Sequence, residues 1–415
     1  MIIINKTNLE HELGYIIENM PIYDIHTHIY PKEFTGMLLT GIDELLVYHY
    51  LLAEYFRYSK IPYDDFFVLN VSEQAELVWD ELFVKRTPIS EPAMGVITIL
   101  KALNIDFKTR DLNLIRKQMK HLTEQPDYVA KILKIANIKQ LVMTNDPFDS
   151  AEMKWWDGGE KADDIFLSSL RLDSLVNTYK SVIPTLKEWG YMVEENISGN
   201  TVTILEKFLT DCINKFEPGY VAVSLAPDFG FTEKYSTQVA IIEEVILPIC
   251  RKYNKPLAIM TGAIRQVNPA LRLAGDWMGQ TDLYAIERLV KDNPDNKFLI
   301  TAISRENQHQ LVVLARKFRN IHIFGCWWQV NIPETIVEIT NMRIELLGLS
   351  TTLQHSDARV LEQLIYKWSH FKELLKPILQ KKYLLLLDAG WQLSDEDLKK
   401  DVNLIFGGAF IEFIR

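Results

Sequence analysis

Two histidines separated by one residue are the clearest sign of chemistry in this sequence. They belong to Asp24-Ile25-His26-Thr27-His28, which lies in an apolar run, 22–29, typical of a buried strand. Because side chains alternate across a strand, His26 and His28 are expected to point to the same side. Two imidazoles on one face suit a divalent transition metal. The plainer alternative is a pair of hydrogen-bonded polar residues at a strand end.

A third metal ligand is expected near the other end of the chain. His355-Ser356-Asp357-Ala358-Arg359 follows the last strand-like run, 351–354. In a closed parallel barrel the first and last strands are neighbours, so Asp357 can reach a metal held by the two histidines. Alternatively, Asp357 caps the N-terminus of the helix that follows. The ends of the fourth, fifth and sixth strands offer no bridging Lys and no further His, which favours one metal ion with open positions. Zinc is the first choice, with Mn, Fe or Co as alternatives.

The elements that would position these residues form an alternating pattern. Short apolar runs rich in β-branched residues are separated by helical segments, which is typical of a parallel sheet covered by helices. Eight such runs predict an α/β fold, a distorted (β/α)8 TIM barrel, with active-site residues at the carboxyl ends of the strands. We expect one domain, 1–415, with a helical insertion, 32–125, between the first two strands. The runs are 22–29, 141–144, 167–172, 220–225, 256–261, 297–303, 321–326 and 351–354.

Composition narrows the class of protein. The chain has 415 residues, 48% of them hydrophobic, and a net charge of −10. No long basic run occurs, which argues against a nucleic-acid partner. No apolar run is long enough to span a membrane. Three widely spaced cysteines suggest no disulfide framework and fit a reducing cytoplasm. A homo-oligomer is compatible with the sequence, although no interface is visible in it.

Further short segments follow one another in a fixed order along nearly the whole chain. Together with the two histidines and the late aspartate, they resemble motifs of the uronate isomerases, a family within the amidohydrolase superfamily. The segments are Tyr48-His49-Tyr50, Thr144-Asn145-Asp146-Pro147-Phe148-Asp149, Arg171-Leu172-Asp173, Gly325-Cys326-Trp327-Trp328-Gln329-Val330-Asn331 and Ser356-Asp357-Ala358-Arg359. There are departures from the family pattern. Leu51 and Leu52 stand where the family has Lys and Trp, and Thr261 stands where many members have His.

The resemblance implies roles for particular residues. Asp357 would be both metal ligand and catalytic base. Tyr50 and His49 would reach over the barrel mouth from the insertion, donate to the substrate carbonyl oxygen and help to move the hydroxyl proton.

Other side chains are candidates for contact with the substrate. Arg359 and Arg171 are candidates for the substrate carboxylate, because a guanidinium binds a carboxylate through two hydrogen bonds. The alternative for Arg171 is an ion pair with Asp173. Of the adjacent Trp327 and Trp328, one is expected to face the site, and Trp327 is the candidate for contact with the sugar.

The resemblance therefore implies an aldose–ketose isomerase with one divalent metal ion and a hexuronate substrate. It would convert D-glucuronate to D-fructuronate, D-galacturonate to D-tagaturonate, or both, by moving a proton from C2 to C1 through an enediolate. The sequence does not separate the two sugars. Two alternatives stay open: a metal-dependent hydrolase of the same superfamily, such as a lactonase or amidohydrolase, and a barrel that binds a sugar acid without catalysis.

Overall fold

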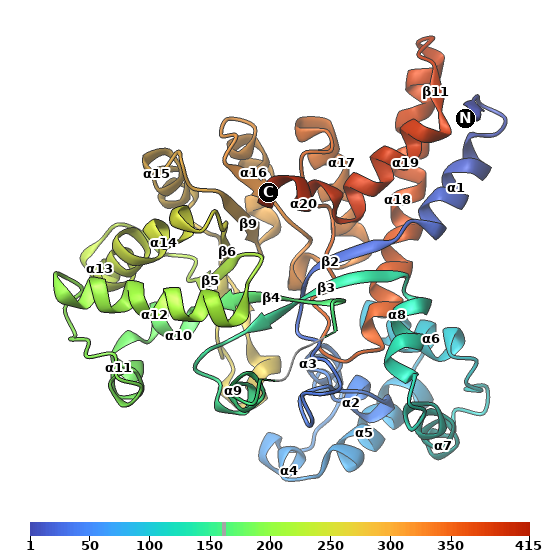
Figure 1. Cartoon of the computed structure of the whole chain (residues 1–415). Helices are drawn as coiled ribbons and strands as arrows, with labels where there is room; N and C mark the ends of the chain where they lie inside the picture. Colours follow the sequence, from blue (N-terminus) through green and yellow to red (C-terminus); the bar gives the residue numbers. More distant parts are fainter. Residues whose placement is uncertain (160–162) are drawn as a thin grey trace.

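A curled parallel sheet lies at the centre of the computed structural model, which describes residues 1–159 and 163–415 (Figure 1). Its seven strands are paired in the order β10-β9-β6-β5-β4-β3-β2. Most of the predicted runs are confirmed as strands, and the fold class is confirmed as a distorted (β/α)8 barrel. The strands are β2 (Ile22–Thr27), β3 (Ile138–Asn145), β4 (Phe166–Arg171), β5 (Val221–Leu225), β6 (Leu257–Thr261), β9 (Phe298–Ala302) and β10 (Ile321–Ile323).

The strands are apolar on both faces because both faces are buried. Inside the curled sheet, Ile25, Val142, Ala258 and Leu299 belong to one cluster of buried side chains. The opposite faces pack against two larger clusters that the sheet shares with the surrounding helices. This double burial explains the continuous apolar runs of the sequence.

The predicted eighth strand, 351–354, is wrong: only Thr352 forms a bridge, with Phe324. The segment still closes the barrel. The backbone of Thr352 is bonded to Ile323 and Gly325 on one side, and Asp357 N donates to His26 O (3.1 Å) on the other. A regular ladder does not form because the side-chain oxygen of Gln354 accepts from the backbone N–H of Cys326 (3.4 Å) and of His355 (3.1 Å).

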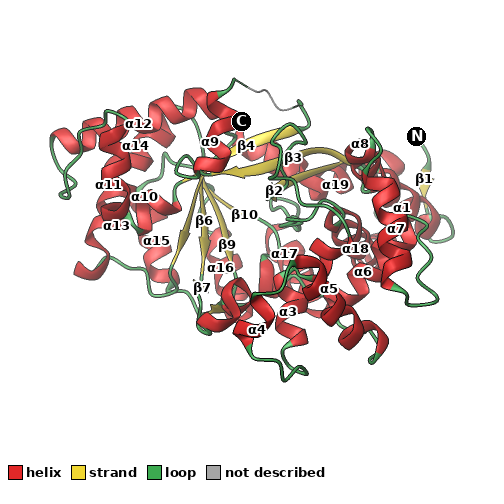
Figure 2. Cartoon of the chain, turned by 90° about the horizontal axis from the view of Figure 1, so that it is seen from below, coloured by secondary structure: helices red, strands yellow, loops and turns green. Residues whose placement is uncertain are grey.

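Helices cover the outer face of the sheet (Figure 2). Pro333 opens its helix as the sequence predicts, because proline fits the first turn, where no N–H is needed. The main helices around the sheet are α8 (Tyr128–Ile135), α9 (Ser150–Asp157), α11 (Tyr179–Glu188), α12 (Asn200–Phe216), α14 (Leu247–Lys252), α15 (Leu283–Asp292), α16 (Gln308–Ala315), α17 (Pro333–Leu347) and α18 (Gln363–Asp388). Short helical pieces join them: α10 (Asp173–Asn177), η2 (Glu233–Tyr235), α13 (Ser236–Ala240), η3 (Ile241–Ile246), η5 (Arg305–Asn307) and η6 (Trp328–Val330).

Between β2 and β3 the polypeptide forms a group of helices, and a short hairpin contacts them. The loop of this hairpin, 265–276, contains the 3-10 helix η4 (Pro269–Gly275) and packs against α3 (His49–Tyr55), the second helix of the group. The hairpin strands are β7 (Ala263–Ile264) and β8 (Trp277–Met278). The helices before α8 are α2 (Ile42–Leu46), α3 (His49–Tyr55), α4 (Tyr63–Phe67), α5 (Val71–Trp79), η1 (Asp80–Val84), α6 (Glu91–Ala102) and α7 (Leu112–Thr123).

The N-terminal strand pairs with a segment near the C-terminus, and the last helix reaches the amino end of the barrel. β1 (Ile3–Ile4), before α1 (Leu9–Asn19), pairs with β11 (Leu393–Ser394), before α19 (Asp395–Asn403). After η7 (Leu404–Gly408), the last helix, α20 (Ala409–Ile414), places Phe410 in the cluster inside the barrel. Its ring lies edge-on to Tyr220, directly before β5, with the centroids 6.0 Å apart. The C-terminal helix thus covers the amino end and leaves the carboxyl end for the site.

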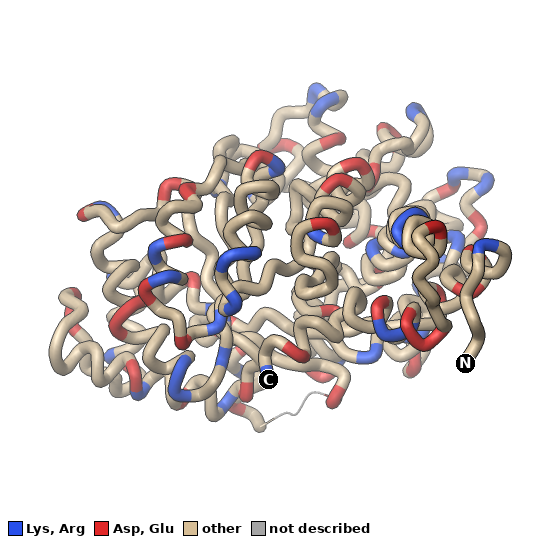
Figure 3. The backbone as a smooth tube through the Cα atoms, turned by 90° about the horizontal axis from the view of Figure 1, so that it is seen from above, with Lys and Arg blue, Asp and Glu red and all other residues tan. Residues whose placement is uncertain are grey.

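Charged residues of both signs are interspersed over the molecule (Figure 3). Because the described residues show no one-sided positive surface, an anion would have to be bound by cationic side chains gathered at the binding site itself. All three cysteines are free and buried. No helix in the described ranges is long and apolar enough to cross a membrane.

Candidate metal centre and substrate pocket

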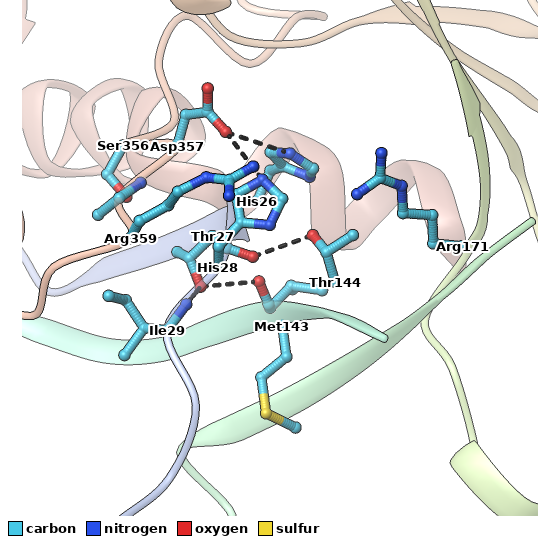
Figure 4. Close-up of polar contacts among 12 residues, drawn as sticks. His26, Thr27, His28, Ile29, Met143, Thr144, Arg171, Ser356, Asp357 and Arg359 are labelled. Carbon is cyan, nitrogen blue, oxygen red and sulfur yellow. Dashed lines mark hydrogen bonds and ion pairs between the residues drawn. The ribbon is translucent and has the colours of Figure 1, made fainter. Parts of the chain in front are cut away.

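His26, His28 and Asp357 meet at the carboxyl end of the barrel (Figure 4). His26 lies in β2 and His28 directly after it, and their Nε2 atoms lie 3.5 Å and 3.4 Å from Asp357 Oδ1. One donor atom from each residue lies within 4.8 Å of the other two. Two imidazole nitrogens and one carboxylate oxygen at this separation fit a divalent transition metal. Among residues 1–159 and 163–415 this is the one such cluster of three His, Cys, Asp or Glu side chains.

The backbone around Asp357 is held by β2. His28 N donates to Ala358 O (2.8 Å), and Asp357 has a positive φ of 53°. The buried carboxylate of Asp24 accepts from Ser356 N (3.1 Å) and from the indole of Trp368 in α18 (2.8 Å). Helix α18 begins only at Gln363, so Asp357 is not its cap and the ligand interpretation is favoured. Sequence reasoning missed Asp24, although its place two residues before His26 was a signal.

The charge states of the cluster suit metal binding. Burial, and next the nearby Arg359 cation, lower the pKa of His28 to about 3. Burial disfavours the ionised form of Asp357, but the hydrogen bonds and charge interactions with His28 and His26 together hold its pKa well below the usual value. The site therefore offers a neutral His28 imidazole and an ionised Asp357 carboxylate at neutral pH, which are the forms that bind a metal.

A pocket opens above the cluster, and all three of these residues line it. Arg359 and Arg171 both line it, and Figure 4 shows them on two sides of the histidines. They differ in their partners. Arg171 is already bound, because its Nε and Nη2 lie 2.8 Å and 2.5 Å from Asp173 Oδ2. The guanidinium of Arg359 has no carboxylate partner among residues 1–159 and 163–415.

The helical segment supplies a second wall of the pocket. Tyr48 and His49, at the start of α3, line it. Tyr50, the tyrosine singled out from the sequence, lines an adjoining pocket on the other side of His49. Its ring lies edge-on to those of Tyr48 and His49, with centroids 5.1 Å and 4.4 Å away. Sequence reasoning missed Tyr48; its only signal was its place beside the His-Tyr pair.

Both tryptophans face the pocket, so the expected division into one inward and one outward ring is wrong. The reason is that β10 ends at Ile323, and Trp328 already lies in a 3-10 helix where strand alternation no longer applies. Trp328 has a positive φ of 48°, and its buried indole nitrogen has no hydrogen-bond partner among the described residues.

Arg265 and Asp276, from the β7–β8 hairpin, were not expected from the sequence. Both line the pocket, and Arg265 Nη1 lies 2.5 Å from Asp276 Oδ2. The guanidinium carbon of Arg265 is 5.7 Å from the Trp328 ring centroid. No local pattern marks these residues, because only the fold of the hairpin brings them to the barrel mouth.

The parallel barrel and its His-His-Asp cluster define a class, the metal-binding (β/α)8 barrels. A search of solved structures then gives a full-length likeness to a uronate isomerase from Bacillus halodurans C-125, which is 44% identical, with a TM-score of 0.96, over 99% of this chain and 97% of that one. The chain belongs to the uronate isomerase family.

More distant structures share the fold alone. A uronate isomerase from Thermotoga maritima is 14% identical, with a TM-score of 0.77, over 98% of this chain and 97% of that one. A glucuronate isomerase from Caulobacter crescentus is 13% identical, with a TM-score of 0.73, over 98% of this chain and 94% of that one. No protein-family model and no curated protein match the chain.

Proposed function

We propose that this protein is a uronate isomerase that interconverts the open form of a D-hexuronate and the matching ketose. The full-length, 44% identical likeness to a protein named a uronate isomerase carries the proposal. The meeting of His26, His28 and Asp357 beside Arg359 supports it, because a bound metal can polarise sugar oxygens and a free cation can bind the carboxylate. Arg359 has no carboxylate partner among residues 1–159 and 163–415.

Arg359 is the proposed principal contact for the substrate carboxylate. Its guanidinium lines the pocket and has no carboxylate partner in the described ranges. No ion pair therefore has to break before it binds both oxygens of the substrate carboxylate. Arg171 is proposed as a weaker contact, because its guanidinium is already paired with Asp173 and the substrate carboxylate would compete with that residue. Trp327, with 5% of its surface exposed, is the proposed apolar wall for the sugar.

The reaction needs a base at C2 and donors at both oxygens. Asp357, ionised at neutral pH, removes the C2 proton and returns the same proton to C1. His49 and a neighbouring tyrosine donate to O1 as negative charge develops there and take up the O2 proton, so protons and charge balance over the cycle. A divalent ion bound by His26, His28 and Asp357 would supply Lewis-acid polarisation of the substrate oxygens.

Either Tyr48 or Tyr50 could be the tyrosine donor. The resemblance to the family names Tyr50, whereas Tyr48 is the one that lines the pocket. Phenylalanine at either position keeps the ring and removes only the hydroxyl. The substitution that lowers kcat with little change in KM identifies the donor.

Several finer features belong to the same proposal. Zinc is the proposed metal, because two histidines and one carboxylate suit it. The helical segment 32–125 is proposed to act within one domain, 1–415, because Tyr48 and His49 complete the pocket. A cytoplasmic location is proposed from the three free, buried cysteines. A homo-oligomer is compatible with these features.

The experiment offers zinc-loaded protein D-glucuronate and D-galacturonate separately and detects the ketose directly. A parallel reaction follows hydrolysis of a simple lactone, and a chelator is added to a second set. We expect ketose from at least one uronate, lost with the chelator. Lactone hydrolysis without any ketose would instead identify a metal-dependent hydrolase, and binding of a uronate without either reaction would identify a non-catalytic barrel.

A further inference from the structure

A buried ion pair lies behind the segment formed by Tyr48, His49 and Tyr50. Lys367 Nζ, in α18, is 3.1 Å from Glu91 Oε1, the first residue of α6, and the two side chains are 5% and 12% exposed. The same ammonium is 5.6 Å from the ring centroid of Tyr50 and 4.9 Å from that of Tyr366, its neighbour in α18. Glu91 also lines the pocket that Tyr50 and His49 share.

The pair connects the two parts of the molecule that build the proposed site. Helix α18 follows the segment that carries Asp357 and Arg359. Helix α6 is joined in turn to α3, because its capping residue Ser90 donates to Glu54 Oε2 (2.5 Å). A continuous set of polar contacts thus runs from α18 through the start of α6 to α3, the helix that holds His49 and Tyr50.

Stability alone is a weak reason for such a pair. Removing two charges from water is costly, and replacing a buried pair with apolar residues is often neutral or stabilising. An ammonium above an aromatic ring is, however, attracted to the ring face, which favours one placement of that ring. Position, rather than folding free energy, is what this arrangement supplies.

We propose that Glu91 and Lys367 are positioning residues for the isomerase reaction, which hold the Tyr48–Tyr50 segment against the metal centre. The inference rests on the proposed function for its kinetic part only. Neither side chain needs to touch the substrate, so both act through Tyr50 and His49. If the segment is displaced by about 1 Å, the rate should fall by about a hundredfold, because donors and reacting atoms lose alignment.

The test compares two double variants on the same helix. Glu91→Gln/Lys367→Met removes both charges together, so neither ion is left buried without its counter-ion. The control is Glu18→Gln/Lys372→Met, which is matched for its lysine: Lys372 is also buried in α18 (8% exposed), 3.6 Å from Oε2 of Glu18, which is 62% exposed. Folding is checked by urea unfolding of both variants, and Lys367→Arg tests whether a cation alone restores the wild-type behaviour.

Two readouts are measured on each protein. In the Glu91/Lys367 variant, backbone amides of residues 48–55 should exchange with solvent about tenfold faster than in the wild type, and kcat should fall about ten- to hundredfold with a smaller change in KM. The control should change neither. Unaltered exchange in 48–55 would overturn the positioning role whatever the activity. Absence of uronate turnover in the wild type would instead refute the proposed function, while the exchange data would still decide the role of the pair.

Discussion

Replacement of Gly325 by alanine should disturb the metal centre indirectly, by displacing the His355 ring that packs against His26. An added Cβ would lie 1.8 Å from Nδ1 of His355, a fully buried ring whose centroid is 5.2 Å from that of His26. The positive φ of 63° adds about 1–2 kcal/mol for any residue with a Cβ. The steric overlap with His355 should cost about 1–3 kcal/mol more. We therefore expect Gly325→Ala to lower the free energy of unfolding by about 2–5 kcal/mol and to weaken metal binding.

Gly348 offers a control, because its φ is 62° and no atom of the described residues lies within 4 Å of a built Cβ. Gly348→Ala should lose only the backbone contribution, about 1–3 kcal/mol at φ 62° and ψ −126°, and keep its metal. Urea unfolding gives both free energies, and elemental analysis after dialysis gives the metal content. Equal destabilisation of the two variants, or full metal retention in Gly325→Ala, would refute the argument that His355 transmits the clash to His26.

Three other predictions concern pH, charge and metal. Burial raises the pKa of Glu152 to about 7, so between pH 4.5 and 7 the folded state keeps a proton that the unfolded state has released. The free energy of unfolding should therefore fall by about 3 kcal/mol as the pH rises from 4.5 to 7. Urea unfolding at both pH values should show this fall in the wild type and not in Glu152→Gln. Arg359→Lys should lower kcat/KM about ten- to hundredfold, and Arg171→Lys much less, since Arg171 is already paired; steady-state kinetics would contradict this if the order were reversed. Zinc at about 100 times its Kd should raise the free energy of unfolding of the wild type by about 3 kcal/mol and leave that of His28→Ala unchanged. Equal stabilisation of the two proteins in urea unfolding would exclude His28 as a ligand.

The strands and the two histidines were predictable because they depend on local periodicity. The continuous apolar runs follow from burial on both faces, and the pair at 26 and 28 follows from alternation along β2. The position of Asp357 beside them followed from barrel closure, which makes the first and last segments neighbours.

The remaining features depend on tertiary contacts that no local pattern encodes. Thr351-Thr352-Leu353-Gln354 has the composition of a strand, yet the amide of Gln354 occupies the backbone donors that a ladder would use. Trp328 leaves the strand pattern because β10 ends early. Arg265 reaches the pocket only because its hairpin folds over the barrel mouth.

Conversion of D-glucuronate and D-galacturonate by wild-type protein and by Asp357→Asn, each with its bound zinc measured, tests the central claim most directly. The account predicts ketose from the wild type and a rate about 10²–10⁴-fold lower in the variant, since a general base contributes about that factor. Wild-type rates in zinc-loaded Asp357→Asn would contradict the assignment of Asp357 as the base.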